Sequence, residues 1–129
     1  MNKVASITTL LFALTTAFSC GPCDDEITLD KTSAKSRIAF LCGTSSTDAS
    51  MDWVDNFLAQ ADSQNLRGNI YAFKYSGGVA IIHRADIMSC LPCNVHDCSG
   101  AEIQITSENS QELIDGMKTE HLIYSTTTL

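Results

Sequence analysis

The chain has 129 residues, of which 44% are hydrophobic, and its 15 acidic and 8 basic residues give a formal net charge of −7. This length accommodates one domain and excludes separate cofactor and substrate domains. The Lys and Arg residues are scattered, which argues against nucleic acid as a partner. The fingerprints GxGxxG, GxxxxGK[ST], HExxH and GxSxG do not occur in the sequence. We therefore expect a protein that is not an enzyme, with no catalytic residues and no cofactor.

The first nineteen residues have the pattern of a signal peptide. A positive start at Met1–Lys3 is followed by an uncharged apolar stretch over Val4–Phe18, and small residues stand at Ala17 and Ser19 before Cys20. This order is typical of a cleaved export signal. The apolar stretch is too short to span about 30 Å of hydrocarbon comfortably as a permanent helix. We predict that residues 1–19 are removed.

The residues around the cleavage point resemble the lipobox of bacterial lipoproteins. Cys20 would be the first mature residue, preceded by Ser and followed by Gly, and the acidic cluster Asp24–Glu26 resembles the surface-export signal of some Bacteroidetes lipoproteins. The resemblance implies that Cys20 carries the lipid, that the membrane is a partner through this lipid, and that residues 20–36 form a tether. It places the protein in the cell envelope, lipid-anchored to the outer membrane on its periplasmic or cell-surface face.

Ordinary secretion is the alternative to a lipid anchor. Ala17 and Ser19 also satisfy the small-x-small rule of the general signal peptidase at the same bond. The position of Cys20 at the cleavage point favours the lipoprotein interpretation.

The mature chain begins with residues that have little periodicity, with at most a short strand at Ile27–Leu29. The compact apolar run Arg37–Cys42 predicts a strand. Apolar residues at helical spacing from Ala49 to Ala61, after an N-cap at Asp48, predict an amphipathic helix. Within it, Trp53 and Phe57 are expected to anchor the core.

A β-hairpin is the best-supported element that follows. Asn69–Tyr75 and Val79–His83 have strand patterns, and the residues Ser76-Gly77-Gly78 between them suit a tight turn. Three shorter elements are predicted after it: a strand at Ala101–Thr106, a helix at Ser110–Met117 and a strand at His121–Ser125.

Together these elements predict a single small α+β domain over residues 37–129. It has one amphipathic helix packed on an antiparallel sheet of three to five strands, with a Cys-rich loop. From Trp53 to Tyr124 the order of elements resembles small uncharacterised Bacteroidetes lipoproteins, and this resemblance implies no particular activity.

The stretch from Cys90 to Cys98 is the chemically densest part of the chain. Exported thiols in a small domain tend to pair, so we expect structural disulfides. The candidates for these disulfides are Cys42, Cys90, Cys93 and Cys98. If Cys20 is lipidated, five thiols remain, and Cys23 in the tether is the candidate for the unpaired one.

Two other interpretations of this stretch remain open. Cys90, Cys93, His96 and Cys98 have the ligand chemistry of a zinc site, although four ligands within nine residues would surround one ion poorly. Cys90 and Cys93 also have the spacing of a thioredoxin-like dithiol, but here that motif follows a hairpin and precedes no helix pattern.

The remaining candidates concern side chains with aromatic rings. His96 beside Cys93 or Cys98 is a formal nucleophilic pair that lacks an orienting group and an oxyanion site. The stripe Tyr71, Phe73 and Tyr75 forms either a binding ledge or, as we expect, a core layer beneath the Trp53 helix.

The predicted function is that of a cell-envelope lipoprotein, a non-enzymatic binding or structural module with a protein or glycan as candidate ligand. The alternative is a metal- or thiol-dependent envelope protein that uses the Cys90–Cys98 loop.

Overall fold

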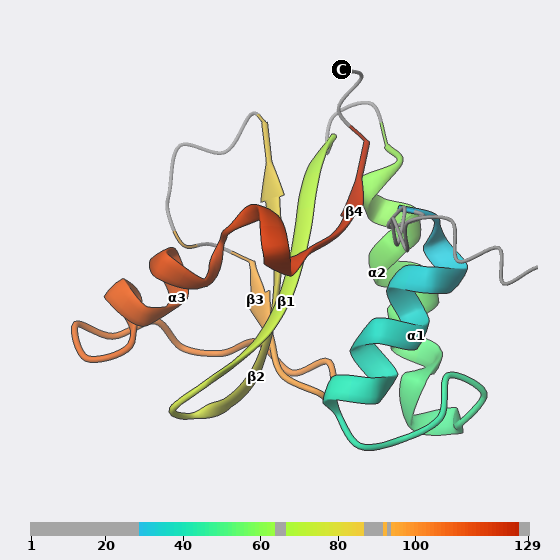
Figure 1. The fold of residues 1–129 in the computed structure, drawn as a ribbon, viewed down its shortest axis with the longest axis horizontal. Coiled ribbons are helices and arrows are strands. Elements are labelled where there is room, and N and C mark those ends of the chain that lie inside the picture. Colours follow the sequence, from blue (N-terminus) through green and yellow to red (C-terminus); the bar gives the residue numbers. More distant parts are fainter. Residues whose placement is uncertain (1–28, 64–66, 87–91, 93, 127–129) are drawn as a thin grey trace, which may run out of the picture.

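The structure is a computed structural model that describes residues 29–63, 67–86, 92 and 94–126. These residues form three α-helices and a four-stranded antiparallel sheet with the strand order β3-β2-β1-β4. The sheet stands between α1 and α2 on one side and α3 on the other (Figure 1). The predicted α+β class with a small antiparallel sheet is confirmed.

The first helix, α1 (Lys31–Leu41), was not predicted. It starts at the N-cap Asp30, whose carboxylate accepts a hydrogen bond from the Ser33 N–H at 2.7 Å. The strand expected at Arg37–Cys42 is wrong, and the helix also includes residues 31–36 of the expected tether.

Small side chains explain why α1 escaped prediction. Its buried face consists of Ala34, Ile38 and Ala39, a narrow stripe that is only partly aliphatic. Phe40, which made the run look continuously apolar, is 80% exposed on the other side of the helix. The continuous apolar run Arg37–Cys42 therefore suggested a strand, although only three residues of α1 form its buried face.

The second helix follows the predicted pattern. Asp48 accepts a hydrogen bond from the Ser50 N–H at 2.9 Å, a 3-10 turn covers Ala49–Met51, and α2 spans Asp52–Ala61. The side chains that α2 buries are Val54, Phe57, Leu58 and Ala61. The amphipathic helix is confirmed, with Phe57 in the core as expected.

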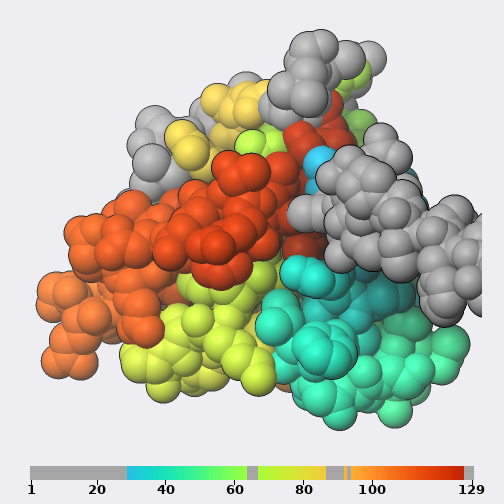
Figure 2. All heavy atoms as spheres, viewed as in Figure 1, coloured from blue at the N-terminus to red at the C-terminus, as the bar shows by residue number. Residues whose placement is uncertain are grey.

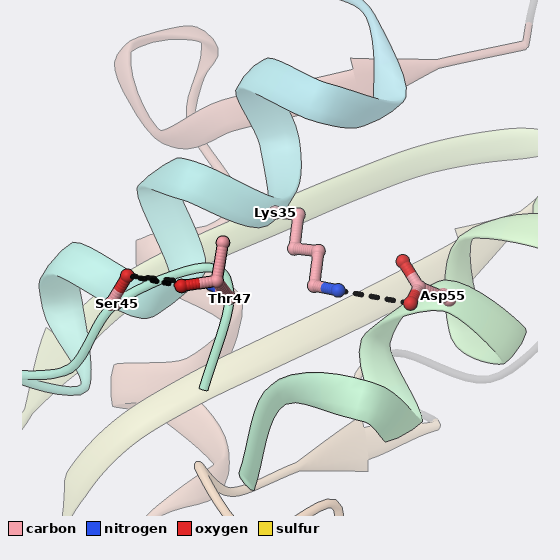
Figure 3. A network of polar contacts seen from close by, with 4 residues as sticks. All are labelled: Lys35, Ser45, Thr47 and Asp55. Atoms are coloured by element: carbon pink, nitrogen blue, oxygen red, sulfur yellow. Dashed lines mark hydrogen bonds and ion pairs between the residues drawn. The ribbon is translucent and has the colours of Figure 1, made fainter. Parts of the chain in front are cut away.

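A surface ion pair joins α1 to α2. The Lys35 ammonium lies 2.9 Å from the Asp55 carboxylate, and a hydrogen bond of 3.1 Å between the Ser45 and Thr47 hydroxyls orders the connecting loop nearby (Figure 3). Because the Asp55 side chain is largely exposed, this pair adds at most about 1 kcal/mol to stability.

The hairpin forms the centre of the sheet. β1 (Gly68–Tyr75) and β2 (Gly78–Ala85) pair along their whole length, with Tyr75 opposite Gly78 at the turn. Gly78 has a φ of +131°, a conformation that L side chains rarely adopt. The predicted hairpin is confirmed, with strands slightly longer than expected.

Two short strands complete the sheet at its edges. β4 (Leu122–Ser125) pairs with the first half of β1, which confirms the predicted closing strand. β3 (Val95–His96) pairs with β2 and lies inside the loop region where no strand was expected.

Each face of the sheet carries its own hydrophobic cluster. Ile70, Ala72 and Ile81 belong to the cluster on the side of α1 and α2. Tyr71 and Phe73 are buried in the cluster on the other side. The aromatic stripe is therefore a core layer, but the expected position beneath the Trp53 helix is wrong, because odd-numbered β1 residues face α3.

The second face is covered by α3 (Ser110–Gly116), where a helix was predicted, and by the residues before it. The strand predicted at Ala101–Thr106 is wrong: within the described residues this segment forms one isolated antiparallel bridge, between His96 and Glu102. The side chains nevertheless alternate between solvent and core, since Ile103 and Ile105 pack against the second cluster and Glu102 and Gln104 are exposed. Pairing stops because β3 itself ends after two residues.

Candidate functional site

A disulfide bond closes the end of the molecule where α1 stops. Cys42, the C-cap of α1, is bonded to Cys98 in the loop after β3, with an S–S distance of 2.06 Å and a sequence separation of 56 residues. Both side chains are half-buried. Two of the four predicted disulfide candidates are thus paired with each other. The other two, Cys90 and Cys93, lie outside the described residues, as do Cys20 and Cys23.

The loop that carries Cys98 is closed by its own hydrogen bonds. One oxygen of the Asp97 carboxylate accepts bonds from the Ser99 N–H at 2.8 Å, the Ser99 hydroxyl at 2.6 Å and the Ala101 N–H at 3.1 Å. The side-chain bond from Ser99 is the main reason why the pKa of Asp97 lies below its usual value. Asp97 is therefore ionised at neutral pH, and its charge holds the loop in one shape.

Trp53 fixes this loop to α2. Its indole N–H donates a hydrogen bond of 3.2 Å to the Cys98 carbonyl. Gly100, with a φ of +82°, lies against the ring so closely that an added Cβ would stand 2.7 Å from the indole atom Cδ2. The half-buried Trp53 is thus a structural anchor for residues 97–101.

His96 occupies a socket between α2 and this loop. Its ring lies 5.2 Å from that of Phe57 and 5.9 Å from that of Trp53, measured between centroids. Its Nδ1 is 3.2 Å from the Gly100 carbonyl oxygen and its Nε2 is 2.8 Å from the Asn94 side-chain oxygen. Both partners are oxygen atoms that only accept hydrogen bonds, and both ring nitrogens are engaged by them.

A second histidine, His83, lies in the core next to His96 and Asn94. It is 1% exposed, and its ring meets that of Phe57 edge to face at 6.1 Å. The Asn94 side chain connects the two histidines, with its nitrogen 3.4 Å from His83 Nδ1. Asn94 has a φ of +56°, a left-handed conformation that Asn tolerates better than most residues. The sequence did not indicate that His83 and His96 are brought together by one asparagine.

These contacts bear directly on the zinc alternative. The Cys98 sulfur is bonded to Cys42 and is not a thiolate, so a site with all four predicted ligands requires reduction of this bond. His96 would also have to give up one of its hydrogen-bond partners. Within the described part of the chain, no three His, Cys, Asp or Glu side chains lie close enough together to hold a metal ion.

A second arrangement of polar groups lies between the hairpin and α3. The Glu112 carboxylate accepts bonds of 2.6 Å from both the N–H and the hydroxyl of Ser76 in the turn. His121 donates from Nδ1 to the Gly116 carbonyl at 2.7 Å and stacks on Phe73. A shallow pocket of about 200 Å³ opens beside these residues. The polar groups of this pocket already hold α3 against the hairpin turn. Figure 2 shows α3 and the hairpin side by side on one face of the molecule.

Gly116 is the residue that permits this contact. A Cβ at this position would lie 2.1 Å from the Phe73 ring. The sequence carried a signal of this, because a glycine at the end of a predicted helix marks either a cap or a close approach.

A larger cleft of about 350 Å³ follows the backbone of Glu102, Ile103, Gln104 and Ile105. Glu102 and Gln104 are exposed, whereas Ile103 and Ile105 are half-buried. The cleft therefore runs along an extended segment at the margin of the sheet.

Comparison with models of protein families, with curated proteins and with solved structures gave no match to this chain. Among the described helices, none has the length and apolarity that crossing a bilayer requires.

Proposed function

We propose that this protein is exported, anchored to the membrane by a lipid on Cys20, and serves as a non-enzymatic binding or structural module of the cell envelope. The observation that carries the proposal is the disulfide between Cys42 and Cys98. Structural disulfides persist in oxidising compartments and are rare in the cytosol. The bond therefore supports export, which the signal-like pattern of residues 1–19 predicts independently.

The position of α1 supports a short anchor. Its first residue, Lys31, forms an ion pair with Asp62 at the end of α2, and Asp62 accepts a hydrogen bond from the Tyr124 hydroxyl on β4. Lys31 is therefore tied to the folded domain at this end of α1. Eleven residue steps separate Lys31 from Cys20, a reach of at most about 40 Å. A lipid on Cys20 would hold the domain within that distance of the bilayer.

The same geometry separates the two ends of the domain. The disulfide lies at the C-cap of α1, and a helix of 11 residues is about 16 Å long. The Cys98 loop is therefore at the end of α1 opposite the attachment point.

The anchor is tested by metabolic labelling with a fatty-acid analogue in the bacterial host. The wild-type protein should take up label and sediment with membranes, and Cys20→Ala should lose the label and become soluble. Cys23→Ala is the matched control, because it removes a neighbouring thiol without touching the proposed acceptor. If the wild-type protein takes up no label and fractionates as soluble, the lipid anchor is wrong and ordinary secretion replaces it.

A further inference from the structure

The segment Glu102–Ile105 occupies the place of a fifth strand. The Ile103 N–H donates a hydrogen bond of 2.8 Å to the Val95 carbonyl, and Glu102 is the bridge partner of His96. Ile103 and Ile105 point toward the second hydrophobic cluster. The segment thus extends the sheet beyond β3, although only one bridge joins the two.

Among the described residues, no strand lies beside the outer edge of this segment. Backbone groups of successive residues in a strand point to opposite edges, so those of Glu102 and Gln104 point away from β3. The Gln104 carbonyl accepts a hydrogen bond of 3.0 Å from the Asn109 side chain. Within the described part of the chain, no hydrogen bond reaches the Gln104 N–H or the N–H and C=O of Glu102.

Asn109 therefore supplies one of the bonds that a further strand would make. The three adjacent groups are left for a partner, and the cleft of about 350 Å³ lies along the same four residues, Glu102–Ile105. Exposed edges of this kind pair readily with an extended chain.

The charge of the chain segment that contains this edge favours one class of partner, and Glu102 lies on the edge itself. Every charged side chain from residue 97 to residue 116 is acidic: Asp97, Glu102, Glu108, Glu112 and Asp115. An acidic edge on a chain of net charge −7 disfavours a second copy and favours a basic segment.

We propose that Glu102–Ile105 binds an extended, basic peptide segment of a partner protein by β-strand addition. The partner's carbonyls accept from the N–H groups of Glu102 and Gln104, and one of its N–H groups donates to the Glu102 carbonyl. A Lys or Arg lies against the Glu102 carboxylate, and an apolar side chain enters the cleft beside Ile103. This proposal names a partner class for the module proposed above and does not depend on the lipid.

The test uses the full chain in detergent and a fluorescein-labelled peptide, Lys-Val-Lys-Val-Thr-Lys, with binding followed by fluorescence anisotropy. Gln104→Pro removes the outward N–H but leaves the Ile103 bond to Val95. Gln104→Ala is the matched control, because it removes the same side chain and keeps the N–H. We expect Gln104→Ala to bind within about twofold of wild type and Gln104→Pro to bind at least about tenfold more weakly, the equivalent of 1.4 kcal/mol.

Two further measurements keep the result interpretable. If Gln104→Pro does not fold, a peptide N-methylated at the amide that faces the Glu102 carbonyl replaces the variant, and it should bind at least about tenfold more weakly than the parent peptide. Glu102→Gln should weaken binding at low salt and reduce its salt dependence. Equal binding by Gln104→Pro, or by the methylated peptide, overturns the proposal, and so does absence of binding to the wild-type chain.

A second copy on this edge would appear as concentration-dependent dimerisation without peptide that Gln104→Pro abolishes, and this too overturns the proposal. Failure of the fatty-acid label with intact peptide binding would instead reject the anchor and leave the edge site standing.

Discussion

Removing the Cys42–Cys98 disulfide should lower stability by several kcal/mol, mainly through the unfolded state. The bond closes a loop of 56 residues, and the chain-entropy relation for a loop of this length gives about 4 kcal/mol at 25 °C. A domain of this size has about 5–10 kcal/mol in total. The variant Cys42→Ala/Cys98→Ala should therefore remain folded at 25 °C but melt roughly 15–30 °C lower.

Urea unfolding followed by the emission of Trp53, the only tryptophan, measures this effect. If the bond acts on the unfolded chain, the double variant should also show a larger m-value, because its unfolded state exposes more surface. Reducing agent should destabilise wild type but change the variant little. A loss below about 1 kcal/mol, or peptide mapping that links Cys98 to Cys90 or Cys93, would contradict a stabilising Cys42–Cys98 bond.

Three other predictions follow from the contacts. Gly116→Ala should cost about 1–3 kcal/mol by urea unfolding, because its Cβ would overlap the Phe73 ring, and combination with Phe73→Leu should recover part of the loss. Trp53→Phe should cost about 1 kcal/mol for the hydrogen bond to the Cys98 loop, and an unchanged free energy of unfolding would contradict that bond. Burial, and then the Asp62 carboxylate, raise the pKa of Tyr124 to about 12. The contribution of neutral Tyr124 to the free energy of unfolding should therefore be complete below pH 10 and be lost as the pH rises through 12. Tyr124→Phe should lose this alkaline dependence in urea titrations, and an identical decline would contradict it.

The elements that the sequence predicted correctly are those whose period was long or whose turn was distinctive. The helix ending at Ala61 repeats its apolar stripe over three turns, and the hairpin has Gly77 and Gly78 between two β-branched or aromatic runs. α1 lacked both signals, because its buried face is made mainly of Ala34 and Ala39. Alanine at a helix interface packs closely but scarcely differs from a surface residue in a sequence pattern.

The parts of the site that escaped prediction depend on contacts distant in the chain. Three cysteines within nine residues made every pairing with Cys42 equally plausible from spacing, and only the fold selects Cys98. The burial of His83 depends on Phe57 and Asn94, which come from different elements. Strand direction alone also could not tell which face of β1 meets which helix, since both faces of the hairpin are apolar.

The disulfide and the open edge belong to one structural unit. β3 has only two residues, so its hydrogen bonds hold the margin of the sheet weakly. What fixes the next segment is the loop of residues 97–101, which the Cys98 sulfur joins to α1, the Cys98 carbonyl joins to Trp53 and the Asp97 carboxylate closes internally. Glu102 follows that loop directly. A rigid edge costs less ordering entropy when a peptide pairs with it, so the crosslink that stabilises the fold also prepares the edge for binding.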